Sequence, residues 1–80
     1  MPEDELFKIE EQTERSAIAE ALREAADDIE SGDIQLVSGT QEQTVTVPES
    51  PRFEVELERL TDSETGAQRY ELEYEIMWTE

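Results

Sequence analysis

The sequence contains neither cysteine nor histidine. These absences exclude disulfides, thiol nucleophiles and metal sites built from Cys and His ligands. Without histidine, the side chain that most often acts as a general acid or base near neutral pH is missing too.

Basic residues and long apolar runs are also scarce. Lys and Arg together number 6, and Lys8 is the only lysine. Because phosphate contacts need clustered Lys and Arg, we expect no direct binding to nucleic acid. No apolar stretch approaches the roughly 20 residues that span a bilayer. The acidic N-terminus lacks the apolar segment of a signal peptide. The sequence therefore predicts a cytoplasmic protein that does not enter a membrane.

Acidic residues, by contrast, are abundant: 23 Asp and Glu give a net charge of −17 over 80 residues. In dilute buffer this charge repels itself and opposes the compact state. At molar salt the Debye length falls to about 3 Å, and most of the repulsion is screened. The composition favours a halophilic protein of a salt-adapted cytoplasm, surrounded by diffuse salt cations. An acidic surface made for a basic partner is the alternative.

Residues 14–31 have the periodicity of one amphipathic helix, because apolar residues recur three and four positions apart. The main members of this stripe are Ile18, Leu22, Ala25 and Ile29. Thr13 is the expected N-cap. Gly32 fits the position after the last turn, where a positive φ is needed.

Five other stretches alternate apolar and polar residues, as half-buried strands do. They are residues 6–12, 34–38, 44–48, 52–61 and 68–78. Short turns separate the last four stretches, over residues 38–43, 48–51 and 63–66. Consecutive strands are therefore expected to pair antiparallel. Leu60 breaks the alternation of its strand, which indicates a bulge or the strand's end.

The element order β-α-β-β-β-β predicts an α+β fold. One amphipathic helix would pack on one face of a mostly antiparallel, curved sheet. We expect residues 1–5 to be a flexible N-terminus and residues 6–80 to form a single domain. The sequence leaves open whether residues 6–12 pair with the second strand or with the last.

The apolar face of the predicted sheet is the first candidate for function. It collects all the aromatic residues of the chain, Phe7, Phe53, Tyr70, Tyr74 and Trp78. Core packing is the favoured interpretation of this stripe. A binding surface is the alternative, because a single helix would leave part of the face exposed. Trp78 is expected to hold the C-terminus in place, since burying an aromatic side chain contributes about 1.5–3 kcal/mol.

The opposite, acidic face is the second candidate. Its members are Glu54, Glu56, Glu58, Glu71, Glu73 and Glu75. A loop over residues 63–66, with Gly66 in the left-handed region, places Leu57 opposite Leu72. This register pairs glutamate with glutamate across the strands, which is destabilising. A register shifted by two would instead place Arg69 opposite Glu58.

A hydrated, salt-screened surface is the favoured interpretation of this acidic face. Ordered binding of Ca²⁺ or Mg²⁺ is a weaker one, because a flat sheet supplies carboxylate ligands from one side only. The chain also lacks the D-x-D-x-D-G loop of a calcium site. Nothing marks one of these glutamates as a buried acid, so paired-carboxylate catalysis is not indicated.

Several motifs follow one another in a set order along residues 6–78. The helix ends A-x-x-I-E-S-G, strands of V-x-V-P and E-V-E-L-E type follow, and the last strand contains E-L-E-x-E-I-x-W. The residues of the first and last motifs are Ala26, Ile29, Glu30, Ser31, Gly32, Glu71, Leu72, Glu73, Glu75, Ile76 and Trp78. Together the motifs resemble the Amphi-Trp domain, a small domain common in haloarchaeal proteomes. The resemblance implies a halophile-type acidic protein and brings no activity or catalytic residue with it.

We therefore predict a non-enzymatic interaction or accessory module with no catalytic residue, cofactor or resident metal. Its partner would be a second copy of the chain or another protein. The alternative function is an acidic mimic of nucleic acid, or a regulator that responds to divalent cations, acting through the Glu-rich face. An enzyme is the third possibility.

Overall fold

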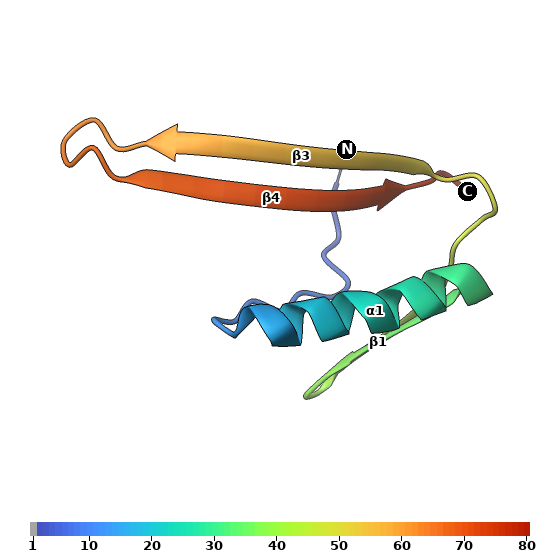
Figure 1. Cartoon of the computed structure of the whole chain (residues 1–80). Coiled ribbons are helices and arrows are strands. Elements are labelled where there is room, and N and C mark those ends of the chain that lie inside the picture. Colours follow the sequence, from blue (N-terminus) through green and yellow to red (C-terminus); the bar gives the residue numbers. More distant parts are fainter. Residues whose placement is uncertain (1) are drawn as a thin grey trace. The chain divides into compact units, whose positions relative to one another are not determined.

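The computed structural model describes residues 2–80, which form one helix and four strands (Figure 1). The elements are α1 (Arg15–Ser31), β1 (Asp33–Ser38), β2 (Gln41–Thr46), β3 (Arg52–Thr61) and β4 (Gln68–Met77). The strands form two antiparallel sheets of two strands each, β1–β2 and β3–β4. The predicted α+β class is confirmed. The single curved sheet is not, because the strands pair two by two.

The chain divides into two compact units, Met1–Glu49 and Ser50–Glu80, which are described separately. The predicted flexible N-terminus, residues 1–5, starts outside the described residues, and residues 2–5 are exposed and form no regular element. The single domain over residues 6–80 stays a prediction.

In the first unit, α1 follows the predicted stripe but starts later than expected. Its N-cap is Glu14, in an extended conformation, and not Thr13. The Glu14 carbonyl accepts the first helical hydrogen bonds, from the N–H groups of Ala17 and Ile18 at 3.0 and 3.2 Å. Thr13 therefore lies one residue too far from the first turn to cap it.

The predicted glycine end of α1 is confirmed. Gly32 has φ +94°, and its N–H donates to the carbonyls of Asp28 (3.0 Å) and Ile29 (3.2 Å). This left-handed conformation costs glycine little, since it has no Cβ. The Gly32 carbonyl then accepts from the N–H of Val47 at 2.7 Å, which holds the end of β2 against the end of the helix.

The β1–β2 hairpin is tighter than the sequence suggested. β2 starts at Gln41 and ends at Thr46, so the turn is shorter than the predicted 38–43 and Val47 lies just beyond the strand. Among residues 2–80, Val47 is the one buried hydrophobic residue, with 7% of its surface exposed. The backbone N–H of Gln35 donates to an Asp28 carboxylate oxygen at 3.4 Å, which links β1 to α1.

The predicted strand over residues 6–12 is wrong: this segment of the described chain forms no ladder. A side chain takes the place of a partner strand at one residue only. The Lys8 N–H donates to Gln41 Oε1 at 3.2 Å, and Gln41 Nε2 donates to the Lys8 carbonyl at 2.9 Å. The Gln41 amide thus satisfies both backbone groups of Lys8, whereas a strand pair would need such bonds to repeat along the chain.

The second unit is the β3–β4 hairpin, whose register runs without interruption from Arg52↔Met77 to Thr61↔Gln68. The predicted pairing of Leu57 with Leu72 is confirmed, and the register shifted by two is not formed. Leu60 does not mark a bulge, because it pairs with Arg69 inside the regular ladder.

The turn of this hairpin is built around Asp62. Its carboxylate accepts from the N–H groups of Glu64 (2.8 Å) and Thr65 (3.4 Å). Its backbone N–H donates to the Ala67 carbonyl, and its carbonyl accepts from the Gly66 N–H. Gly66 has φ +75°, so its predicted left-handed conformation is confirmed. These bonds fix the reversal of the chain and with it the register of both strands.

Candidate functional site

Strict alternation sorts the side chains of the β3–β4 hairpin onto two faces, because successive residues of a strand point to opposite sides. One side, the apolar face, is formed by Phe53, Val55, Leu57, Tyr70, Leu72, Tyr74 and Ile76. The other side, the acidic face, is formed by Glu54, Glu56, Glu58, Glu71, Glu73 and Glu75. The continuous register keeps the two sets apart along the full length of both strands.

No part of the β3–β4 hairpin itself covers the apolar face. Leu57, at its centre, is 68% exposed, and Phe53 at one end is 63% exposed. The rings of Phe53 and Tyr74 lie diagonally across the strands with centroids 6.4 Å apart and planes 20° apart, a stacked pair. At the other end, the Tyr70 hydroxyl donates to Gln68 Oε1 at 3.1 Å. The face is thus an ordered apolar surface with aromatic rings towards both ends.

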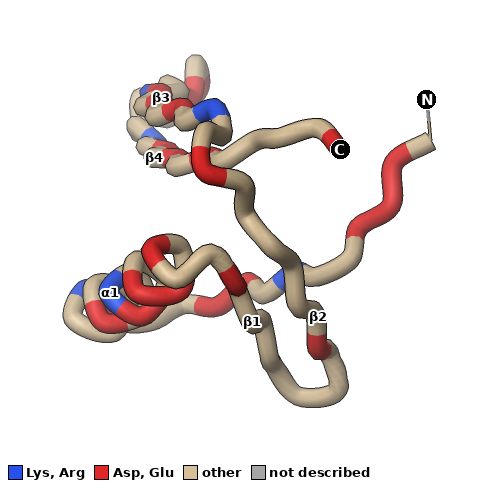
Figure 2. Tube along the Cα trace, turned by 90° about the vertical axis from the view of Figure 1, so that its right-hand side faces the viewer, with Lys and Arg blue, Asp and Glu red and all other residues tan. Residues whose placement is uncertain are grey.

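The acidic face carries three cross-strand pairs of glutamates, as predicted. They are Glu54↔Glu75, Glu56↔Glu73 and Glu58↔Glu71. Figure 2 shows the acidic residues recurring along β3, β4 and α1, with few basic residues between them. Like charges directly opposite each other on a sheet are destabilising. The hairpin therefore keeps a repulsive surface on the side opposite its apolar side chains.

At the centre of the acidic face, the neighbouring glutamates change the protonation equilibrium of Glu56. A side-chain hydrogen bond with Glu58, and then the charge of Glu58, raise the pKa of Glu56 above its ordinary 4.5. The charges of Glu54 and Glu73 act in the same direction. A proton on Glu56 relieves the crowding, because it removes one charge and supplies a donor to its neighbour.

Each end of the acidic face has one arginine. Arg52 pairs with Met77, and Arg69 pairs with Leu60. The Arg69 guanidinium forms an ion pair with Glu71, with Nη2 and Oε1 2.9 Å apart. Leu60 is an isolated apolar side chain on this side and is 47% exposed. The two leucines Leu57 and Leu60 thus offer the same side chain on opposite faces of one strand.

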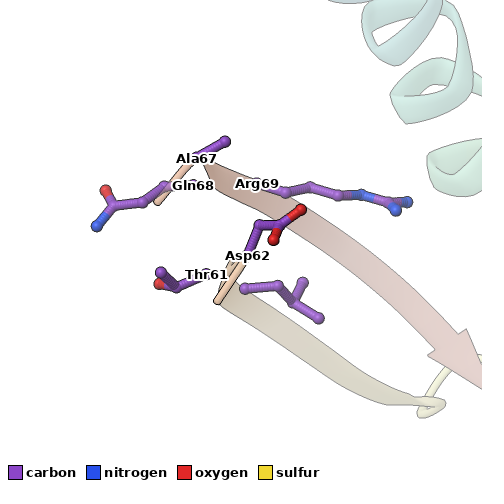
Figure 3. A pocket seen from close by; sticks show the side chains of 6 residues that line it. Thr61, Asp62, Ala67, Gln68 and Arg69 are labelled. Carbon is purple, nitrogen blue, oxygen red and sulfur yellow. The ribbon is translucent and has the colours of Figure 1, made fainter. Parts of the chain in front are cut away.

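A hollow of about 320 Å³ lies at the turn end of the hairpin (Figure 3). It is lined by Leu60, Thr61, Asp62, Ala67, Gln68 and Arg69. Figure 3 shows Arg69 and Asp62 directed to one side of the ribbon, and Thr61 and Gln68 to the other. The Asp62 carboxylate accepts hydrogen bonds from N–H groups of the turn. The structure of the turn therefore explains why this polar side chain lies in the hollow.

The structure gathers only part of the predicted aromatic stripe on one surface. Phe53, Tyr70 and Tyr74 lie together on the apolar face. Trp78 is half-buried and lies just after β4, which ends at Met77, so the observed strand stops one residue before the predicted strand over residues 68–78. Phe7 belongs to the first unit, where it lines a hollow of about 190 Å³ beside α1 and β1.

Aliphatic side chains form as much of the apolar face as the aromatic ones do. Val55, Leu57, Leu72 and Ile76 fill the face between the rings, although the candidate stripe was defined by aromatic residues alone. Period-two alternation places them on the same side as Phe53 and Tyr74. Alternation predicts which face a side chain lies on, but it does not predict how much of that side chain is exposed.

Within residues 2–80, no group of three or more Asp or Glu side chains is arranged to hold a metal ion. No helical segment of these residues is both long and apolar enough to cross a bilayer.

The family model of the Amphi-Trp domain matches residues 1–80, the entire chain. The chain belongs to the Amphi-Trp domain family. Searches of curated proteins and of solved structures gave no match. For this Amphi-Trp domain, then, the two faces of the β3–β4 hairpin are the basis for assigning a function.

Proposed function

We propose that this Amphi-Trp domain is a non-catalytic interaction module that binds a protein partner through the apolar face of its β3–β4 hairpin. The exposure of that face carries the proposal, since contiguous apolar surface mostly marks a contact with another protein. A two-stranded hairpin is also marginal by itself in water and gains stability when its hydrophobic face is covered. Covering the face would serve binding and stability together.

The acidic face has a different part in this proposal. Its carboxylates would keep the domain hydrated and soluble in a salt-adapted cytoplasm, with diffuse cations around them. Five of its six glutamates are exposed and Glu71 is half-buried. Such side chains suit solvation better than acid–base catalysis, which depends on a carboxyl whose pKa is raised by burial. No role in binding nucleic acid or a membrane is proposed.

Position-specific photo-crosslinking tests which face binds. A benzoylphenylalanine residue would replace Val55 on the apolar face, and in a matched variant Glu56 on the acidic face. Both variants would be irradiated in a salt-adapted host, and the crosslinked products compared. We expect products from position 55 and none above background from position 56.

Two results would contradict the proposal. Products from position 56 alone would favour the alternative, an acidic mimic or cation-responsive regulator that acts through the Glu-rich face. Products from neither position, in cells that contain the folded domain, would mean that the hairpin is not a binding surface.

A further inference from the structure

The apolar face of the β3–β4 hairpin carries a more specific inference, which rests on the proposed function. We propose that its partner is a second copy of the chain, and that the two apolar faces meet in a two-fold symmetric, salt-dependent dimer. Three observations support it: the area of the face, the position of the charges around it, and the residue pair at the middle of its strand ladder.

The area is sufficient for a small specific interface. The six most exposed side chains of the apolar face are Phe53, Val55, Leu57, Tyr70, Leu72 and Tyr74. With exposed fractions of 52–68% they present roughly 700 Å² per copy, so two facing copies would bury at most about 1,400 Å². Specific interfaces start at about 1,200 Å² of total buried area. One partner face of the same size therefore meets the requirement.

The position of the charges favours a face-to-face contact of like with like. All six glutamates within the strands β3 and β4 lie on the acidic face, so the contact between apolar faces buries none of their carboxylates. In the dimer the two acidic faces point outward, on the far sides of two sheets packed about 10 Å apart. Their separation then exceeds the Debye length of about 3 Å at 1 M salt. At molar salt, repulsion between the copies is small.

One basic residue favours a particular orientation of the two copies relative to each other. Arg59 lies on the apolar side of the ladder, opposite Tyr70, towards one end of the face. The stacked rings of Phe53 and Tyr74 lie at the other end. A two-fold axis that crosses the strands brings the arginine end of each hairpin over the ring end of the other. This arrangement separates the two guanidinium groups and places each near an aromatic face, which attracts a cation.

This two-fold axis passes over the middle residue pair of the β3–β4 ladder. The pair Leu57↔Leu72 is the third of five residue pairs on this side, between Phe53↔Ile76 and Thr61↔Gln68. Leu57 would therefore lie beside its own counterpart, so that one substitution changes the centre of the interface twice. In dilute buffer, the charge of −17 on each copy opposes the contact and the dimer is expected to dissociate.

The test measures the mass of the full chain by sedimentation equilibrium, in KCl from millimolar to molar concentration. We expect a monomer at low salt and a dimer at molar salt. Leu57→Glu places two charges at the centre and should raise the dimer Kd about a hundredfold or more, as loss of a central anchor does. Leu60→Glu is the matched control, with the same substitution on the acidic side, and should change the Kd less than about threefold.

A second pair of variants covers the case in which Leu57→Glu fails to fold, as judged by circular dichroism. The chain has no cysteine, so Leu57→Cys and Leu60→Cys each introduce a unique thiol. A short bismaleimide should link two copies of Leu57→Cys at molar salt, and link Leu60→Cys only at the rate of random collision.

The outcomes also separate this inference from the proposed function. A monomer at every salt concentration, or equal linkage of both cysteine variants, overturns the dimer. If photo-crosslinks from position 55 to another protein persist in that case, the interaction module stands and its partner is different. A monomer that hides the Leu57→Cys thiol from the reagent would mean that the chain covers the face itself, and both proposals fail.

Discussion

Replacing Glu75 by lysine should stabilise the β3–β4 hairpin, because it converts a repulsive cross-strand pair into an attractive one. Glu75 lies directly opposite Glu54. A like or unlike charge pair at such a position changes stability by roughly 0.2–1 kcal/mol in either direction, so the exchange is worth about 1 kcal/mol. The diagonal neighbours Glu56 and Arg52 carry opposite charges, and their contributions to the change largely offset each other.

For a domain of this size, 1 kcal/mol corresponds to roughly 4–8 °C in Tm. The assay is thermal unfolding at low and at molar KCl, followed by the fluorescence of Trp78, which lies directly after β4. We expect the full increase in dilute buffer. At molar salt most of it should disappear, since the Debye length of about 3 Å is then shorter than the separation between opposed side chains.

Glu42→Lys supplies the control. Glu42 lies on β2 opposite Val37, so the substitution changes the net charge equally without removing a cross-strand repulsion. It should raise Tm in dilute buffer clearly less than Glu75→Lys. An equal increase for both variants would show that only the net charge matters. A Glu75→Lys effect of the same size at molar salt would refute the electrostatic reasoning.

Two further predictions concern single side chains. Because the pKa of Glu56 is raised in the folded state, mainly through the hydrogen bond with Glu58, its contribution to stability is fully present below pH 4.5 and is lost as the pH rises through the raised value. Glu56→Gln should therefore flatten the pH dependence of Tm just above pH 4.5, and an unchanged profile would contradict this assignment. Gln41→Ala should remove both hydrogen bonds to the Lys8 backbone and speed hydrogen exchange of the Lys8 amide, whereas Gln43→Ala should leave that exchange rate unchanged.

The hairpin and the helix could be read from the sequence because each depends on local patterns. Alternation through β3 and β4 excludes a slip by one residue, since that slip would move the apolar side chains of one strand to the acidic side. It left the register shifted by two open, and the structure has the other register, with a turn that ends in Gly66. The 3.6-residue periodicity and Gly32 similarly define α1 and its end. For these elements, local preference and the final structure agree.

The remaining differences arise where the outcome depends on distant residues. Residues 6–12 alternate like a strand, but their backbone meets the side chain of Gln41, and no pattern near Lys8 announces that contact. The sequence also cannot show that four strands pair two by two, because alternation describes the faces of a strand and not the identity of its neighbours. Within the candidate site, it placed the residues on the correct faces and left their exposure to the structure.

The uninterrupted ladder of the hairpin has a consequence for how its gene can change in length. Inserting or deleting one codon within β3 would move every later side chain of that strand to the opposite side, bringing glutamates among leucines and tyrosines. Changes of two codons would preserve the order of the faces. A single-codon change at residues 62–67, between the strands, would leave the alternation within each strand intact and alter only the turn that Asp62 and Gly66 close.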